Sequence, residues 1–334
     1  MSLGRYLSLG FRLVVSAILL AVLLTRLDLG DMGRFLGRAD LRLVVVTLVA
    51  VLMDRCLMAG RWIFLLETLG IRAPRGKVVK IFFLSTFFGS FLPSGIGGEA
   101  VRAVSFSRLT SKGVESVASV AMDRLLGMLS MLLTGLAAFV LSYRVYRHPA
   151  LLGTVSALSI VALALLAVLL SPSVHQWILM RFGESERGWK GRVRRGIEAM
   201  GRYRACPGVL ALVLLMSVGV QVLRVFQAYL LSEAMDLGTP LVYFFCFVPL
   251  ILIITMLPIS VSGLGTTNLA YVALFGPVGM DPDGAFVLSI LILALGVIGN
   301  LPGGLIYAIE GFSSTQSKGE NQGNHGKLER ASLL

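Results

Sequence analysis

Charged residues are scarce in this sequence. Only 14% of its 334 residues are charged, whereas 56% are hydrophobic, and the mean hydropathy is +0.84. Soluble domains contain about 25% charged residues, so an ordinary soluble protein is excluded. Charge-free windows of about 18 residues or more recur along the chain, and each is long enough to cross a bilayer core as a helix. Because strands of a membrane barrel would instead alternate in polarity, we predict an all-α polytopic membrane protein.

Cysteine and histidine are rare as well. The three cysteines lie far apart, without a C-x-x-C pair, at Cys56, Cys206 and Cys246. That pattern predicts neither a disulfide framework nor a zinc site. The three histidines lie in or beside loops or the tail, at His148, His175 and His325. The sequence also contains no H-E-x-x-H, nucleophile-elbow or Walker motif, so we expect no catalytic residue, no metal and no cofactor.

One acidic cluster lies at residues 281–283. The triplet Asp281-Pro282-Asp283 is similar to the acidic pair by which some sugar transferases hold a metal. It directly precedes an apolar run, where an Asp acting as a helix N-cap and a turn explain it better. We therefore interpret the triplet as a helix start.

Acidic residues are fewer than basic ones, 18 against 30, which gives a formal net charge of +12. Most of the basic excess lies in short loops beside apolar runs, as the positive-inside rule describes, so a nucleic-acid partner is not expected. The most basic loop, 171–207, is predicted to be cytoplasmic. Counting spans outward places both termini and the basic segment 72–80 on the same side. The predicted location is the cell (plasma or inner) membrane.

Six apolar segments predict full spans, at about 7–25, 42–66, 116–142, 150–170, 208–231 and 284–309. They form one predicted transmembrane domain over 1–310, with halves at about 42–142 and 208–309. The remaining 311–334 form a polar tail rich in Ser, Gly, Asn and Lys, for which we predict disorder.

Two further apolar regions, 78–107 and 237–280, are interrupted by proline and glycine. The first contains Pro93, Gly95, Gly97 and Gly98, and the second contains Pro258, Gly263 and Gly265. Charge makes a second full crossing of the first region costly, at about 2.5–3.5 kcal/mol for a charged residue at the helix centre. We therefore predict two re-entrant helical hairpins that enter from opposite sides, as in inverted-repeat transporters. Two unrelated helix kinks are the alternative explanation.

The breaks carry a chemical consequence, because a restarting helix exposes N–H groups that attract anions. Ionisable residues at membrane depth extend this pattern: Asp54, Arg55, Glu99, Arg102, Asp123, Arg124 and Arg224, with Arg61 near a helix end. Arginines outnumber acids, which favours an anionic ligand such as a phosphate ester. Since adjacent helical residues point to different faces, we expect neither Asp54/Arg55 nor Asp123/Arg124 to pair internally. The predicted ligand-binding residues are Pro93, Gly95, Gly97, Gly98, Glu99, Arg102, Asp123, Arg124, Arg224, Pro258, Gly263, Gly265 and Asn268.

These motifs together resemble those of a known family. The pattern consists of Leu92-Pro93 with Gly95, Gly97, Gly98 and Arg102, then Met122-Asp123-Arg124 with Gly127, then Leu257-Pro258-Ile259-Ser260 with Gly263 and Gly265. It is similar to that of the lysylphosphatidylglycerol synthase transmembrane region, or flippase-like domain family, over about 8–310. The resemblance implies movement of modified phospholipids across the bilayer, and in some members a link to glycosyltransferases.

The chain departs from the family in two respects. Thr266, Thr267 and Asn268 stand where the family often has a basic and an acidic residue, and the soluble aminoacyl-transfer domain of full synthases is missing. We therefore expect a non-enzymatic lipid translocase for an anionic phospholipid or a polyprenyl-phosphate-linked lipid. The alternatives are a membrane-embedded subunit or enzyme of lipid-linked glycosyl or aminoacyl transfer, and a non-transporting scaffold that binds a transferase through loop 171–207.

Overall fold

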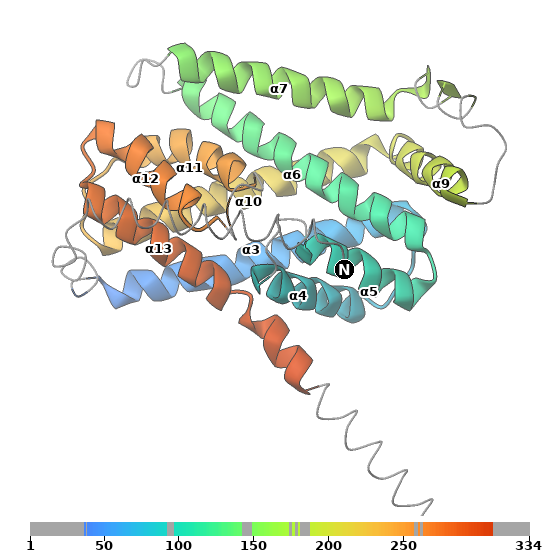
Figure 1. The fold of residues 1–334 in the computed structure, drawn as a ribbon, viewed down its shortest axis with the longest axis horizontal. Coiled ribbons are helices and arrows are strands. Elements are labelled where there is room, and N and C mark those ends of the chain that lie inside the picture. Colours follow the sequence, from blue (N-terminus) through green and yellow to red (C-terminus); the bar gives the residue numbers. More distant parts are fainter. Residues whose placement is uncertain are drawn as a thin grey trace, which may run out of the picture.

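The chain folds into a bundle of helices (Figure 1). The computed structural model describes residues 37, 39–91, 97–141, 149–173, 176–177, 180, 188–256, 260 and 263–309. Its helices are α3 (Leu41–Thr68), α4 (Arg75–Phe91), α5 (Gly97–Thr110), α6 (Gly113–Leu141), α7 (Pro149–Leu170), α9 (Gly188–Tyr203), α10 (Pro207–Ala234), α11 (Leu241–Met256), α12 (Thr266–Phe275), η1 (Gly276–Val278) and α13 (Pro282–Ile298). The described residues contain no strand, which confirms the predicted all-helical class.

Four helical segments are long and apolar enough to cross a membrane: Leu41–Thr68, Gly113–Leu141, Pro207–Ala234 and Pro282–Ile309. They match four of the predicted spans. The predicted span at 150–170 coincides with the 22-residue helix α7. The span predicted at 7–25 and the tail at 311–334 lie outside the described residues.

Helices α3 and α10 form the antiparallel centre of the bundle. The backbone N–H of Asp40, just before α3, donates to the carbonyl of Ala234 at the end of α10, at 2.8 Å. In Figure 1 the two helices run side by side along the long axis, with α6 and α7 covering one flank. Because α3 and α10 extend over the whole bundle, they contribute residues to both of its ends.

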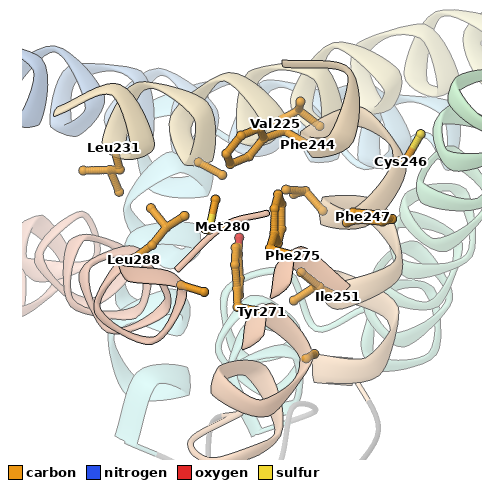
Figure 2. Close-up of a cluster of buried hydrophobic side chains, with 14 of the residues drawn as sticks. Val225, Leu231, Phe244, Cys246, Phe247, Ile251, Tyr271, Phe275, Met280 and Leu288 are labelled. Carbon is orange, nitrogen blue, oxygen red and sulfur yellow. The ribbon is translucent and has the colours of Figure 1, made fainter. Parts of the chain in front are cut away.

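Each end of the bundle has its own apolar core. At one end Phe244, Phe247, Tyr271 and Phe275 interlock, with the rings of Tyr271 and Phe275 stacked at 5.5 Å (Figure 2). At the other end, side chains of α3, α4, α5, α6 and α9 pack around Trp62. Polar and charged residues lie in the middle of the bundle, between the two cores.

The two interrupted regions form two pairs of short helices. Helices α4 and α5 contact each other, and so do α11 and α12. In Figure 1 the first pair lies toward the right end of α3 and α10, and the second pair lies at the left end. Three predicted break residues, Pro93, Gly95 and Pro258, lie outside the described residues.

The predicted loop 171–207 contains the helix α9, which we did not expect. Tyr203, at its end, is fully buried, and its hydroxyl donates to the carbonyl of Leu65 at 3.2 Å. Burial raises the pKa of the Tyr203 phenol, because desolvation penalises its charged form. Arg192 and Arg195 remain exposed on the same helix. The buried apolar side of α9 therefore packs against α3 and α6, while its basic side stays exposed.

The span predicted at 284–309 is interrupted. Helix α13 ends at Ile298, a turn follows at Gly299 and Asn300, and 301–309 are helical again. Glycines allow this segment to approach α4 closely, since a Cβ on Gly303 would lie 2.0 Å from the carbonyl oxygen of Phe83. Asp281 is the N-cap of α13 and accepts hydrogen bonds from the backbone of Asp283 and Gly284, which confirms its interpretation as a helix start.

Replacing Gly303 with alanine should destabilise the fold. The added methyl group would clash with the backbone of α4, and overpacking of this kind costs about 1–3 kcal/mol. Thermal unfolding in detergent measures the effect. Gly219→Ala on α10 is the control, because its Cβ would meet no atom within 4 Å. Equal unfolding temperatures for the two variants would contradict the packing described for Gly303.

Candidate functional site

A cavity of about 460 Å³ lies between the two apolar cores. Its wall is formed by α3, α4, α5, α6, α10, α11 and α13. The ionisable residues in the lining are Arg55, Arg61, Glu99, Arg102, Asp123, Arg124 and Arg224. The structure therefore brings six of the predicted site residues, from α5, α6 and α10, to one place: Gly98, Glu99, Arg102, Asp123, Arg124 and Arg224.

Asp123 is the most heavily engaged carboxylate in the cavity. One oxygen accepts from Nε of Arg61 at 2.7 Å, and the other accepts from a terminal nitrogen of Arg102 at 3.0 Å. All three side chains are at least nine-tenths buried. Arg61 also donates to the hydroxyl of Ser217 on α10 at 2.8 Å. This network joins α3, α5, α6 and α10.

Arg102 lies in the first half of α5 and faces aromatic rings as well as Asp123. Its guanidinium carbon is 5.0 Å from the ring centre of Trp62 and 5.5 Å from that of Phe82, distances typical of cation–π contacts. Its buried Nε has no hydrogen-bond partner among the described residues. A buried donor without a partner is unfavourable, so this N–H lacks a hydrogen bond that an additional acceptor would supply.

Glu99 and Arg124 form a second ion pair, with 2.7 Å between their nearest atoms. Both side chains are partly open, at 26% and 22% exposed. The pair links the first turn of α5 to α6. It is thus the most accessible ion pair in the described lining, since Arg61, Arg102 and Asp123 are almost completely covered.

A third cluster surrounds Asp54, which is 1% exposed and contacts Arg55 and Arg224. The expectation that Asp54 and Arg55 would not pair was wrong: the flexible Arg55 side chain bends back and donates to its neighbour. Asp123 and Arg124 do take separate partners, as expected. Arg55 further donates to the amide oxygen of Asn300 at 2.8 Å.

The glycines of the first helix pair serve close packing. Gly97 is the first residue of α5, and Gly98 follows it. A Cβ on Gly98 would lie 2.7 Å from the carbonyl oxygen of Ser85, and one on Gly89 would lie 3.0 Å from Gly98 Cα. Helices α4 and α5 therefore meet backbone to backbone beside the cavity, and Gly89 and Gly98 both belong to its lining.

Three predicted residues of the second helix pair, Gly263, Gly265 and Asn268, do not line the cavity. Gly263 and Gly265 have φ of 80° and 85°, which favour glycine, and Gly265 is the N-cap of α12. The amide of Asn268 accepts from Gly265 N–H at 2.9 Å and donates to Ser289 at 2.6 Å, so it stabilises this helix start. The pair reaches the cavity instead through Thr255 and Met256 at the end of α11.

Several cavity residues were absent from the predicted site. Arg55 and Arg61 were recognised only as charges at membrane depth, while Gln221, Thr255 and Asn300 were not considered. Asn300 begins the segment Asn300-Leu301-Pro302-Gly303-Gly304, a third combination of proline and glycines that could have indicated the break after α13. No group of metal-binding side chains occurs in the part of the chain that the structure describes.

Replacing Asp123 with asparagine should destabilise the protein by about 3–5 kcal/mol, because Arg61 and Arg102 would remain buried without their counter-charge. Chemical or thermal unfolding in detergent measures this loss. Glu67→Gln is the matched control, since it removes only the exposed pair with Arg75 and should cost less than about 1 kcal/mol. A loss for Asp123→Asn no larger than that of the control would contradict the role of this network.

Comparison with known families agrees with the resemblance seen in the sequence. The family model described as "Lysylphosphatidylglycerol synthase TM region" matches residues 10–303, which include every residue of the cavity lining. No curated protein matches the chain. Together, the helices of membrane-spanning length and this match show an integral, multi-pass membrane protein of lipid-related function. The chain belongs to the lysylphosphatidylglycerol synthase transmembrane-region family.

Proposed function

We propose that this protein is a lipid translocase, which moves an anionic phospholipid or a polyprenyl-phosphate-linked lipid between the leaflets of the cell membrane. The observation that carries the proposal is the excess of arginine in a cavity inside a membrane bundle. Five arginines line it against two carboxylates, and Asp54 behind the wall raises the acids to three. Unbalanced charge in a region of low dielectric is unfavourable, so an anionic headgroup would stabilise the cavity.

The arrangement of donors suits a phosphate group. The planar guanidinium of arginine donates two parallel hydrogen bonds to phosphate oxygens. The partly open side chain of Arg124 is the position that an entering phosphate would contact first, and the covered, unpartnered Nε of Arg102 would be reached after it. In this proposal Asp123 does not contact the lipid, and it holds Arg61 and Arg102 in place through both carboxylate oxygens.

The lengths of the paired helices support re-entrant hairpins. At 1.5 Å per residue, α4 and α5, with 17 and 14 residues, extend about 25 and 21 Å, and α11 and α12, with 16 and 10, extend about 24 and 15 Å. A full crossing requires about 30 Å. Since the pairs lie toward opposite ends of α3 and α10 and both contribute to the cavity, an inverted repeat with alternating access is the arrangement we propose.

The orientation follows from the distribution of basic residues. The end of the bundle that carries α9 also holds exposed Arg72, Arg75 and Lys77. We infer that this end faces the cytoplasm, together with both termini, because basic loops are retained on that side. The α4/α5 pair would then open toward the cytoplasm and the α11/α12 pair toward the opposite surface. A glycosyltransferase or another lipid-modifying enzyme would be a partner at the cytoplasmic end.

Replacing Arg124 with glutamine should slow lipid movement at least ten-fold, since a hydrogen bond to a charged group contributes about 1.5–3 kcal/mol. The assay uses reconstituted vesicles that contain tail-labelled phosphatidylglycerol, with dithionite quenching of the outer leaflet. Arg102→Gln should have the same effect, with folding checked by thermal unfolding. Arg204→Gln, an exposed residue after α9, is the control. Unchanged rates in both cavity variants would refute the site.

The proposed function includes no catalytic step by this chain. Purified protein should therefore transfer nothing from a nucleotide sugar or an aminoacyl donor to added lipid, as measured by mass spectrometry of the lipid fraction. Consumption of either donor would instead support a membrane-embedded enzyme. Capture of a transferase through the basic segment, combined with no lipid movement in vesicles, would support a scaffold.

A further inference from the structure

Gln221 contributes a second kind of polar group to the cavity. It lies on α10, is 2% exposed and belongs to the cavity lining. Its Nε2 donates to the hydroxyl oxygen of Ser130 at 3.3 Å, and Ser130 donates its own proton to the carbonyl of Gly127 at 2.7 Å. Because that proton is already used, Ser130 can only accept from Gln221. The amide nitrogen must therefore face Ser130, which fixes the orientation of the side chain.

The amide oxygen of Gln221 remains without a hydrogen-bond partner among the described residues. An unsatisfied buried acceptor costs about 1–3 kcal/mol, so such groups in folded proteins normally receive a donor. A phosphate diester has no proton to donate. The anionic group that the arginines attract therefore cannot satisfy Gln221, whereas a hydrogen-bond donor elsewhere on the same ligand would do so.

Gln221 lies between two residues of α10 that belong to the charged clusters of the cavity. Ser217, Gln221 and Arg224 are spaced by four and three residues and so share one face of α10. Ser217 accepts a hydrogen bond from Arg61, and Arg224 lines the cavity. Gln221 is thus about 4.5–6 Å along the helix axis from each of them. A group attached directly to the phosphate would reach it.

We propose that Gln221 determines headgroup specificity by accepting a hydrogen bond from a hydroxyl group next to the lipid phosphate. A hydroxyl fits better than an ammonium group, since five arginines would repel a cation. The ligand class is then a phosphate ester lipid with a hydroxylated headgroup, such as a glycerol or a sugar. This inference rests on the proposed lipid-binding function, and it concerns which headgroup is bound rather than how it moves.

The selectivity should be measurable in the unmodified protein. Phosphatidylglycerol and phosphatidylmethanol carry the same charge and can carry the same acyl chains, but only the former has headgroup hydroxyls. Retention of each lipid by the detergent-solubilised protein, measured by native mass spectrometry, should favour phosphatidylglycerol about ten-fold, because phosphatidylmethanol would leave the buried amide oxygen of Gln221 without a donor. Equal retention would overturn the proposal and would mean that water satisfies Gln221.

The variant Gln221→Met assigns the preference to this residue. Methionine has a similar size but no amide, so retention of phosphatidylmethanol should persist while the ten-fold preference disappears. Gln227→Met on the same helix is the control, because Gln227 does not line the cavity and its replacement should leave the preference intact. A preference that survives in Gln221→Met would also refute the assignment.

Failure of this proposal can be distinguished from failure of the proposed function. Retention is measured in detergent and does not depend on movement across a bilayer. A protein that prefers phosphatidylglycerol but moves no lipid in vesicles would support the role of Gln221 and contradict translocation. A protein that moves both lipids equally well would support translocation and contradict the role of Gln221.

Discussion

The carboxylate of Asp123 balances two buried arginines that come from different helices, Arg61 of α3 and Arg102 of α5. Since Asp123 itself belongs to α6 and Arg61 continues to Ser217 on α10, four helices depend on one charge. Desolvated charges are tolerated only with close, well-directed partners. This constraint sets the relative position of the helices and, with it, the shape of the cavity.

Stability and the proposed function are only partly separated within this group of charges, because Arg102 belongs to the Asp123 network and is also a proposed phosphate contact. The Asp123 network is covered and fixed, whereas the pair of Glu99 and Arg124 is partly open to the cavity. Helix breaks leave backbone N–H and C=O groups without partners inside the helix. In a membrane protein these groups must lie against other protein groups or face a wet cavity. The break after α13 illustrates the point: Asn300 donates to Ser90 of α4 and accepts from Arg55 of α3, so it joins three helices beside the cavity.

Much of the architecture could be predicted locally. Hydropathy over about 20 residues located the long helices, and proline with glycine located the interrupted regions, because both properties depend only on neighbours in sequence. Local rules were less successful for side-chain partners. The distance along the chain between Arg61 and Asp123 is 62 residues, and no periodicity indicates such a pair. Asn268, predicted to bind ligand, is engaged in the start of α12 because its partner Ser289 arrives from α13.

The sequence by itself determined the membrane class, the family motifs and the presence of an arginine excess at membrane depth. Only the tertiary structure decided which of these charges share a cavity and which satisfy each other. It also revealed the buried position of Gln221 in the cavity, because nothing in the sequence distinguishes this residue from any other polar residue in an apolar helix. The physical reason is that hydropathy and helix breaks are properties of a short segment, whereas charge balance and hydrogen-bond satisfaction depend on all the helices that meet at one point.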